Sequence, residues 1–125
     1  IQRVQKASVH VNGDVVSSIG RGLCVLIGIH KNDGPSDIEY IVRKILNIRV
    51  FEDDEKKRWQ KSVKDLDLEV LCVSQFTLYC DLKGNKPDYR HNMGPEAAQI
   101  FYGNFLDALK NQYCKEKIKG KKVTY

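Results

Sequence analysis

The chain has 125 residues, 42% of them hydrophobic and 30% charged, and 21 Lys and Arg against 16 Asp and Glu give it a formal charge of +5. This composition is typical of a globular domain, and we expect residues 1–125 to form a single one. The apolar runs fall short of the roughly 18 residues of a membrane span, and the N-terminal residues lack the apolar core of a signal peptide. The sequence therefore excludes a transmembrane protein and favours a cytoplasmic one.

The first part of the chain predicts a hairpin and a buried strand. Apolar and polar residues alternate over residues 7–19, and the central pair Asn12-Gly13 favours a type I′ turn. The almost wholly apolar run at residues 23–29 is bounded by glycines before it and by turn residues after it. This pattern predicts a central strand.

A helix and a further strand are expected next. Ser36 at the N-cap and Glu39 three residues later form a capping box, and apolar residues follow at helical spacing through Leu46. Residues 47–51 predict a strand, and residues 52–61 form a charged loop.

The second half predicts one long strand, a basic loop and one more helix. Residues 69–79 are the longest strand candidate, residues 81–94 are the basic loop, and Pro95 begins the helix. The lysine-rich tail from residue 115 has little to bury. Because the strands follow one another too closely for regular βαβ units, we expect an α+β fold with two main helices on an antiparallel or mixed sheet.

Conventional catalytic and metal-binding patterns are missing. The four cysteines form no C-x-x-C pair, and Cys24 and Cys72 lie in apolar runs as small buried side chains, which favours a reduced protein without a metal. The three histidines are scattered, and none neighbours a Ser or Cys in a recognisable catalytic motif. The acidic run at residues 52–55 has the chemistry for Mg²⁺, but a solvated turn explains it more simply.

The segment at residues 73–79, VSQFTLY, carries the strongest functional signal. In a strand, Ser74 and Phe76 would share one face, and Gln75 and Thr77 the other. Buried polar groups need hydrogen-bond partners, because each unsatisfied group costs about 1–3 kcal/mol. From the residues alone, the segment is either a strand that passes from the core to the surface or part of a functional site.

Several stretches occur in the order that is typical of one enzyme family. They are IQRV and ASV near the N-terminus, then GRG, RKILNIRVFED, VSQFTLY, and KGNKPD before the last helix. Together they cover roughly residues 1–119, and SQFTL is the most specific. The chain thus resembles the D-aminoacyl-tRNA deacylases, also called D-tyrosyl-tRNA deacylases.

This resemblance implies an ester hydrolase that needs no cofactor. Members cleave the ester between a D-amino acid and the 3′-terminal adenosine of tRNA, and they also act on glycyl-tRNA, so they proofread chirality in translation. The resemblance implies a small β-barrel-like fold and a homodimer in which the partner subunit completes each site.

The resemblance also assigns roles to residues. Gln75, Phe76 and Thr77 are the expected catalytic residues: backbone N–H groups around the Gln75–Phe76 step form an oxyanion hole, while the 2′-hydroxyl of the RNA helps to activate water. Thr77 is expected to position the substrate, because no base is apparent to deprotonate it. Ser74 and Gln75 bind the adenosine and the substrate amino group, Phe76 packs to fix the turn, and Arg3 lies near the motif that selects chirality.

Two further expectations concern the basic loop and the C-terminus. Lys83, Lys86 and Arg90 are expected to contact tRNA phosphates. The family carries an Asn-Asp-Gly-Pro-Val-Thr strand whose Gly–cis-Pro enters the partner's site and excludes L side chains. Residues 120–125 read GKKVTY. We therefore expect residues 1–125 to lack this motif.

Two other functions stay open. The resemblance also implies a link to DNA at replication origins, which some relatives have, and the basic loop and the lysine-rich tail suit such a non-catalytic DNA-binding protein. Loss of turnover on changing Gln75 and Thr77 distinguishes the two functions. A folded remnant kept for assembly is the third possibility.

Overall fold

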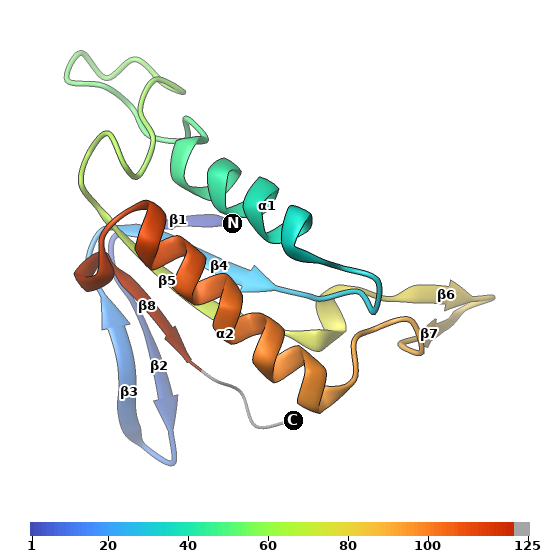
Figure 1. Ribbon diagram of the computed structural model, residues 1–125. Coiled ribbons are helices and arrows are strands. Elements are labelled where there is room, and N and C mark those ends of the chain that lie inside the picture. Colours follow the sequence, from blue (N-terminus) through green and yellow to red (C-terminus); the bar gives the residue numbers. More distant parts are fainter. Residues whose placement is uncertain (122–125) are drawn as a thin grey trace.

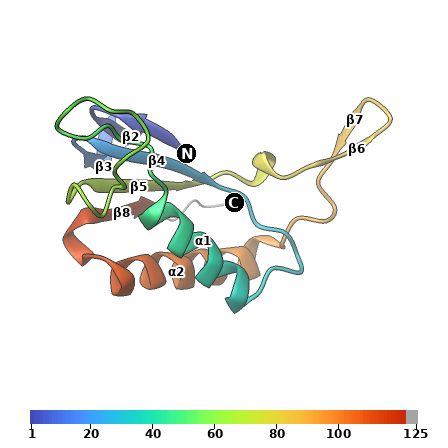
Figure 2. The same ribbon diagram turned by 90° about the horizontal axis from the view of Figure 1, so that it is seen from above.

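The computed structural model describes residues 1–121, which form an α+β fold. A four-stranded mixed sheet has two helices on one face, and a short hairpin extends away from the body (Figures 1 and 2). In sheet order, the strands are β1 (Gln2–Val4), β4 (Gly22–Ile27), β5 (Glu69–Ser74) and β8 (Ile118–Lys121). The β1–β4 pair is antiparallel, whereas β4, β5 and β8 run parallel to one another.

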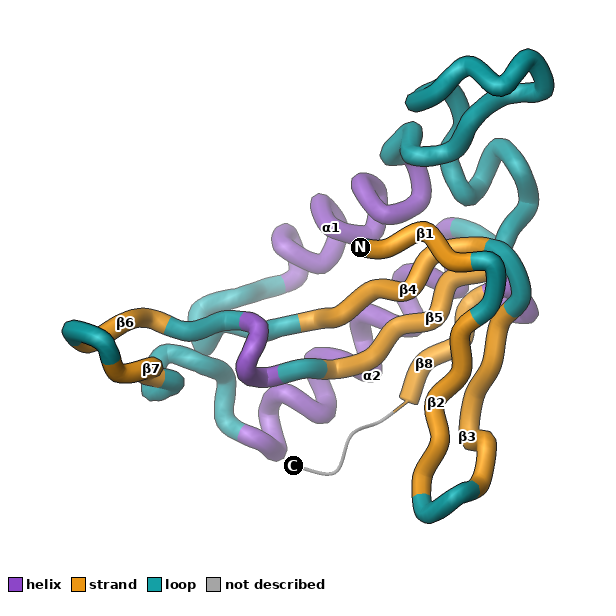
Figure 3. The backbone as a smooth tube through the Cα atoms, turned by 180° about the vertical axis from the view of Figure 1, so that it is seen from behind, coloured by secondary structure: helices purple, strands orange, loops and turns teal. Residues whose placement is uncertain are grey.

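The remaining elements are two helices, two hairpins and two turns of 3₁₀ helix. The helices are α1 (Pro35–Asn47) and α2 (Pro95–Gln112). The hairpin strands are β2 (Ala7–Val11), β3 (Asp14–Ile19), β6 (Asp81–Lys83) and β7 (Lys86–Asp88), and the 3₁₀ turns are η1 (Phe76–Leu78) and η2 (Lys115–Lys117). Strand β3 contacts β5 and β8, and the β2–β3 hairpin projects beyond the sheet (Figure 3). Neither helix is long and apolar enough to cross a membrane.

One hydrophobic cluster joins the helices to the sheet. Its members come from β4, β5, β8, both helices and the 50–63 loop, and they include Leu23, Val25, Val42, Ile45, Phe51, Val63, Val70, Cys72, Tyr102, Phe105, Leu109 and Ile118. The buried Tyr102 hydroxyl donates a hydrogen bond to the Cys72 carbonyl at 3.0 Å. The apolar stripes of α1 and α2 therefore face the same side of the central strands.

The predicted hairpin, central strand and second helix are confirmed. Asn12 and Gly13 have φ angles of 52° and 84°, as a type I′ turn requires. Strand β4 ends at Ile27, two residues earlier than the apolar run, and α2 begins at Pro95 with Gly94 as its N-cap.

The predicted start of the first helix is wrong by two residues. Gly34 is the N-cap, Pro35 occupies the first helical position, and the Asp37 carboxylate accepts a hydrogen bond from the Gly34 N–H at 2.8 Å. Proline suits this position because its fixed φ is helical and its missing N–H is not needed there. The Ser36–Glu39 pair therefore lies inside the helix.

The strand predicted at residues 47–51 is also wrong. Helix α1 extends through Asn47, and the Ile48 N–H still donates to the Lys44 carbonyl at 2.9 Å. Only Phe51 makes a bridge, an antiparallel one to Lys61 across the charged loop. Ile48 is the extended C-cap of α1 and Phe51 enters the core. A short apolar run does not distinguish this arrangement from a strand.

The C-terminal part contains a strand where an unburied tail was expected. Ile118 begins β8, is 3% exposed, and pairs with Val70 of β5. Residues 122–125 of the expected tail lie outside the described residues.

The barrel-like sheet implied by the family resemblance is not formed by residues 1–121. The four-stranded sheet stays open, with β1 at one edge and β8 at the other, while β2–β3 and β6–β7 form separate two-stranded sheets. The α+β class is confirmed, but without closure.

Candidate functional site

The SQFTL segment lies where two parallel strands end side by side. Ile27, the last residue of β4, is in register with Ser74, the last residue of β5. The chain leaves the sheet after both residues, so the segment lies at the carboxyl ends of parallel strands, the edge where α/β proteins commonly bind ligands. Ser74 is 4% exposed, whereas Gln75 is exposed.

The strand predicted to reach Tyr79 ends at Ser74 and is followed by a 3₁₀ turn. The Gln75 N–H donates to the Ile27 carbonyl at 2.8 Å, and the Leu78 N–H donates to the Gln75 carbonyl at 3.1 Å. The two-residue alternation predicted for this segment is therefore wrong beyond Ser74. Phe76 is 50% exposed, because the turn carries its side chain out of the sheet.

Gly28 allows this turn to lie close to the end of β4. A Cβ atom at Gly28 would lie 3.2 Å from the Leu78 Cβ and 3.2 Å from the Tyr79 nitrogen. These distances are shorter than ordinary van der Waals contacts. Any larger residue would push the turn outward.

One N–H group of the expected oxyanion hole is already hydrogen-bonded within the fold. The Gln75 N–H is engaged by Ile27 as the last hydrogen bond between the two strand ends, so it is not available to a substrate in this conformation. The Gln75 side-chain amide instead donates to the Thr77 hydroxyl oxygen. Within residues 1–121, no hydrogen bond engages the Thr77 N–H.

Residues from the predicted basic loop hold this turn, and the sequence did not indicate them. The Asn92 side chain donates to the Phe76 carbonyl at 2.7 Å, and the Asn92 N–H donates to the Tyr89 carbonyl at 3.0 Å. The Tyr89 ring meets the Phe76 ring edge to face, with centroids 5.6 Å apart. Asn92 also forms a β-bridge with His30. This pairing of distant segments leaves no local sequence signal.

A histidine and aromatic cluster lies beside the turn. His91 Nδ1 and Asp81 Oδ2 are 2.5 Å apart, the His30 and His91 rings are 6.4 Å apart, and the His30 ring meets Tyr79 edge to face at 5.1 Å. Neither histidine forms a hydrogen bond with Thr77 among the described residues. The structure therefore places no base on the Thr77 hydroxyl.

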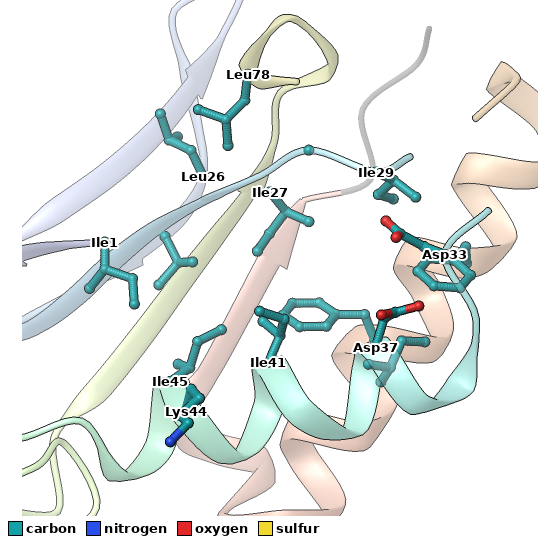
Figure 4. Close-up of a pocket in the computed structure, with 15 residues that line it drawn as sticks. Ile1, Leu26, Ile27, Ile29, Asp33, Asp37, Ile41, Lys44, Ile45 and Leu78 are labelled. Carbon is teal, nitrogen blue, oxygen red and sulfur yellow. The ribbon is translucent and has the colours of Figure 1, made fainter. Parts of the chain in front are cut away.

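An apolar cavity of about 270 Å³ lies between β4, α1 and α2 and reaches the turn at Leu78. Figure 4 shows Ile41 and Ile45 rising from α1 toward Ile27 of β4, with Asp33 and Asp37 at one end. Its lining suits an apolar group rather than a nucleotide.

The structure does not bring Arg3 to the turn. Arg3 pairs with Leu23, four positions before Ile27, which is about 13 Å along the strand. Its guanidinium lies 6.0 Å from the centre of the Trp59 ring.

The three basic residues of the loop have different surroundings. Strands β6 and β7 pair Lys83 with Lys86 at the hairpin end, where both are exposed. Arg90 instead forms an ion pair with Asp88 at 2.6 Å. Hydrogen bonds from the Arg90 backbone and side chain hold the pKa of Asp88 below its usual value. The hairpin end is therefore cationic, whereas Arg90 is partly neutralised.

The cysteines and acidic residues form no metal centre in residues 1–121: no three His, Cys, Asp or Glu side chains group to hold an ion there. Cys72 is buried and Cys24 partly buried. Burial, with a smaller contribution from Cys24, raises the pKa of the Cys72 thiol to about 12. This thiol is therefore protonated at neutral pH and is a poor nucleophile.

A family model described as D-Tyr-tRNA(Tyr) deacylase matches residues 1–123. The chain belongs to this family. D-aminoacyl-tRNA deacylase 1 of Danio rerio is 60% identical over 119 residues, which are 95% of this chain and 58% of that protein. The D-aminoacyl-tRNA deacylase of Drosophila melanogaster is 61% identical over 119 residues, 95% of this chain and 75% of that protein.

A solved structure of the c-Myc DNA Unwinding Element Binding Protein has the same fold, with a TM-score of 0.94 and 55% identity. The match covers 99% of this chain and 84% of that one. The chain thus spans less than two thirds of the length of the Danio rerio relative, but most of the solved structure.

Proposed function

We propose that this chain hydrolyses the ester bond of D-aminoacyl-tRNA and of mischarged glycyl-tRNA. The observation that carries the proposal is the family match over residues 1–123, which includes the SQFTL segment. That segment forms an exposed turn at the carboxyl ends of two parallel strands. Backbone donors on such a turn can meet the charge that develops when water attacks the ester.

We assign the oxyanion donor to the Thr77 N–H in place of the Gln75 N–H. The Phe76 carbonyl and the Thr77 N–H belong to one trans peptide unit and point in opposite directions. Because Asn92 binds the Phe76 carbonyl from one side, it holds the Thr77 N–H toward the other. An N–H group already fixed in this way needs no reorganisation as the oxyanion forms.

The Gln75 and Thr77 side chains then position the substrate. The Thr77 hydroxyl accepts a hydrogen bond from the Gln75 amide, which leaves its own proton free to be donated. An amide is not a base, so this pair supports positioning rather than nucleophilic attack. Ser74, buried at the end of β5, keeps its proposed role in binding the adenosine.

The first prediction concerns these two side chains. Changing Gln75→Ala and Thr77→Val together removes the hydrogen-bonded pair. Because the substrate then loses its positioning, we expect the rate constant for D-Tyr release from D-Tyr-tRNA to fall by about 10- to 100-fold. The unchanged protein, assayed on D-Tyr-tRNA and L-Tyr-tRNA, provides the control. If a full-length protein that carries the Gly–cis-Pro strand releases neither amino acid, the esterase is ruled out, and if it releases both equally, proofreading is ruled out.

The second prediction concerns Lys83 and Lys86. Replacing both by Ala should weaken tRNA binding and reduce the slope of log affinity against log salt by about 1–2, because each phosphate contact releases condensed counterions. Fluorescence anisotropy of labelled tRNA from low to moderate salt measures this slope. An unchanged slope would contradict the assignment of the hairpin lysines.

A homodimer whose partner subunit completes the site and a cytoplasmic location are further parts of this proposal. The exposed apolar residues beside the turn support the dimer: Leu26 and Leu78 are 46% and 56% exposed. Arg3 is proposed to act toward that second subunit, since it lies away from the turn of its own chain.

DNA binding without catalysis is the second candidate function. It is favoured by the similarity to a solved structure described as a DNA unwinding element binding protein and by the cationic hairpin end. The Gln75→Ala, Thr77→Val variant distinguishes the two: an esterase loses turnover and keeps its nucleic-acid affinity, whereas a binding protein has no turnover to lose.

A further inference from the structure

An exposed aromatic pair beside the turn is not used by the proposed chemistry. Phe76 is 50% exposed and Tyr89 is 37% exposed. Their ring planes meet at 70°, so the edge of one ring packs on the face of the other and fixes its orientation. Asn92 hydrogen-bonds to the carbonyls of both residues, so it holds Tyr89 at a set place relative to the turn.

The hairpin that leads to Tyr89 carries its unpaired cations at one end. Register places the Asp81–Asp88 pair and the Lys83–Lys86 pair on the same face, two residues apart along each strand. Asp88 forms an ion pair with Arg90. Asp81 hydrogen-bonds to His91. The two lysines form no ion pair among residues 1–121. The aspartates therefore have partners of their own, and the lysines stay available to an anion.

We propose that Tyr89, held by Phe76, stacks on an unpaired nucleotide adjoining the 3′-terminal adenosine of tRNA, while Lys83 and Lys86 bind the phosphates that precede it. This inference rests on the proposed function and names how that site holds its RNA. Tyr89 lies three residues after Lys86, about 10 Å along an extended protein chain, so a single strand of RNA can contact both residues.

The chemistry of this surface favours a single-stranded nucleic acid. An accessible aromatic ring beside free cations is the usual combination for unpaired nucleotides, because every base has a face that stacks and every linkage carries a negative charge. Stacking of one base is worth about 1–3 kcal/mol, which corresponds to roughly 5- to 150-fold in affinity. The exposed Leu82 makes a protein contact the competing outcome.

Binding of uncharged tRNA tests the stacking directly. Tyr89→Leu should weaken binding of tRNA with its complete 3′ end by about 10-fold. It should leave unchanged the affinity for the same tRNA without its unpaired 3′ nucleotides. Tyr89→Phe keeps the ring and should bind as the unchanged protein does. Tyr40→Leu, which removes another exposed tyrosine on α1, is the matched control and should have no effect.

Hydrolysis separates this inference from the proposed function. Tyr89→Leu should lower kcat/KM on D-Tyr-tRNA about 10-fold more than it lowers kcat/KM on the D-tyrosyl ester of adenosine alone, which has no second nucleotide to stack. If the unchanged protein cleaves neither substrate, the proposed function fails, while the binding result still decides the stacking.

Three results would overturn the stacking. They are equal weakening for complete and shortened tRNA, equal weakening in Tyr89→Phe and Tyr89→Leu, and unchanged tRNA binding in Tyr89→Leu, whether or not the oligomeric mass in solution also falls. Unchanged binding together with a lower oligomeric mass would assign this surface to a protein contact.

Discussion

The hydroxyl of Tyr113 joins the end of α2 to the loop that precedes β5. It donates a hydrogen bond to the Leu68 carbonyl at 2.7 Å. Burial, and then the negative charge of Asp67, raises the pKa of Tyr113 from 10.0 to about 12. The Tyr113 side chain thus links the C-terminal end of α2 to the loop before β5.

The third prediction follows from this pKa. Below pH 10 Tyr113 is protonated in both folded and unfolded chains, and its contribution to stability is complete. Between pH 10 and 12 the unfolded chain loses the proton first, so the free energy of unfolding falls. Tyr113→Phe should cost about 1 kcal/mol at pH 8, and less at pH 11. Urea unfolding at both values measures this difference.

The control for this prediction is internal. The Cys72 thiol, whose pKa is also raised to about 12, gives the same fall in stability in both proteins and cancels in the difference. A difference between Tyr113→Phe and the unchanged protein that is as large at pH 11 as at pH 8 would contradict the role of the hydroxyl.

At the scale of elements, the start of α1 shows how a helix cap depends on the chain before it. The carboxylate of Asp37 accepts the Gly34 N–H, and its charge lies in the first turn, where the helix dipole favours an anion. Ser36 makes no cap hydrogen bond, because the helix has already begun at Pro35. Two neighbouring polar residues therefore differ in their contribution to stability.

The fourth prediction compares these two residues. Asp37→Ala should lower the free energy of unfolding by about 1 kcal/mol, the usual cost of losing a cap. Ser36→Ala should change it by less than about 0.5 kcal/mol, as for an exposed helical position. Urea denaturation measures the free energy of unfolding of both variants, provided that their m-values agree. A larger loss of stability in Ser36→Ala than in Asp37→Ala would instead support Ser36 as the N-cap.

Taken as a whole, the molecule is held by one core that spans its two layers. Leu109 of α2 is fully buried, and it shares this core with strands from both halves of the chain. Strand β8 completes the sheet by pairing with β5, and its Ile118 is buried in the same cluster. The layers therefore cannot separate without exposing the whole cluster.

The fifth prediction tests this cohesion. Leu109→Ala leaves a cavity under the sheet, and we expect a loss of about 2–5 kcal/mol in the free energy of unfolding. Circular dichroism of the helices and the fluorescence of a probe at the exposed Cys80, which follows β5 along the chain, should report one common transition. Two separate transitions would show that the helical layer unfolds by itself.

Local sequence signals were sufficient where a few adjacent residues decide the conformation. Asn12 and Gly13 predict their turn because positive φ angles suit few residue types. The SQFTL segment and its neighbours identify the family without any structure, because their order and spacing are specific. The α+β class follows from the spacing of the elements in the same way.

Tertiary structure alone decided where β5 ends and what surrounds the candidate site. The apolar run after Glu69 gives no sign that the chain turns at Gln75, since that turn depends on the Ile27 carbonyl and on the space left by Gly28. Asn92 and Tyr89 reach Phe76 only because residues 29–31 and 91–93 pair across the fold. Hydrogen bonds between segments so far apart in the chain leave no periodic pattern in the sequence, which is why a single sequence does not predict them.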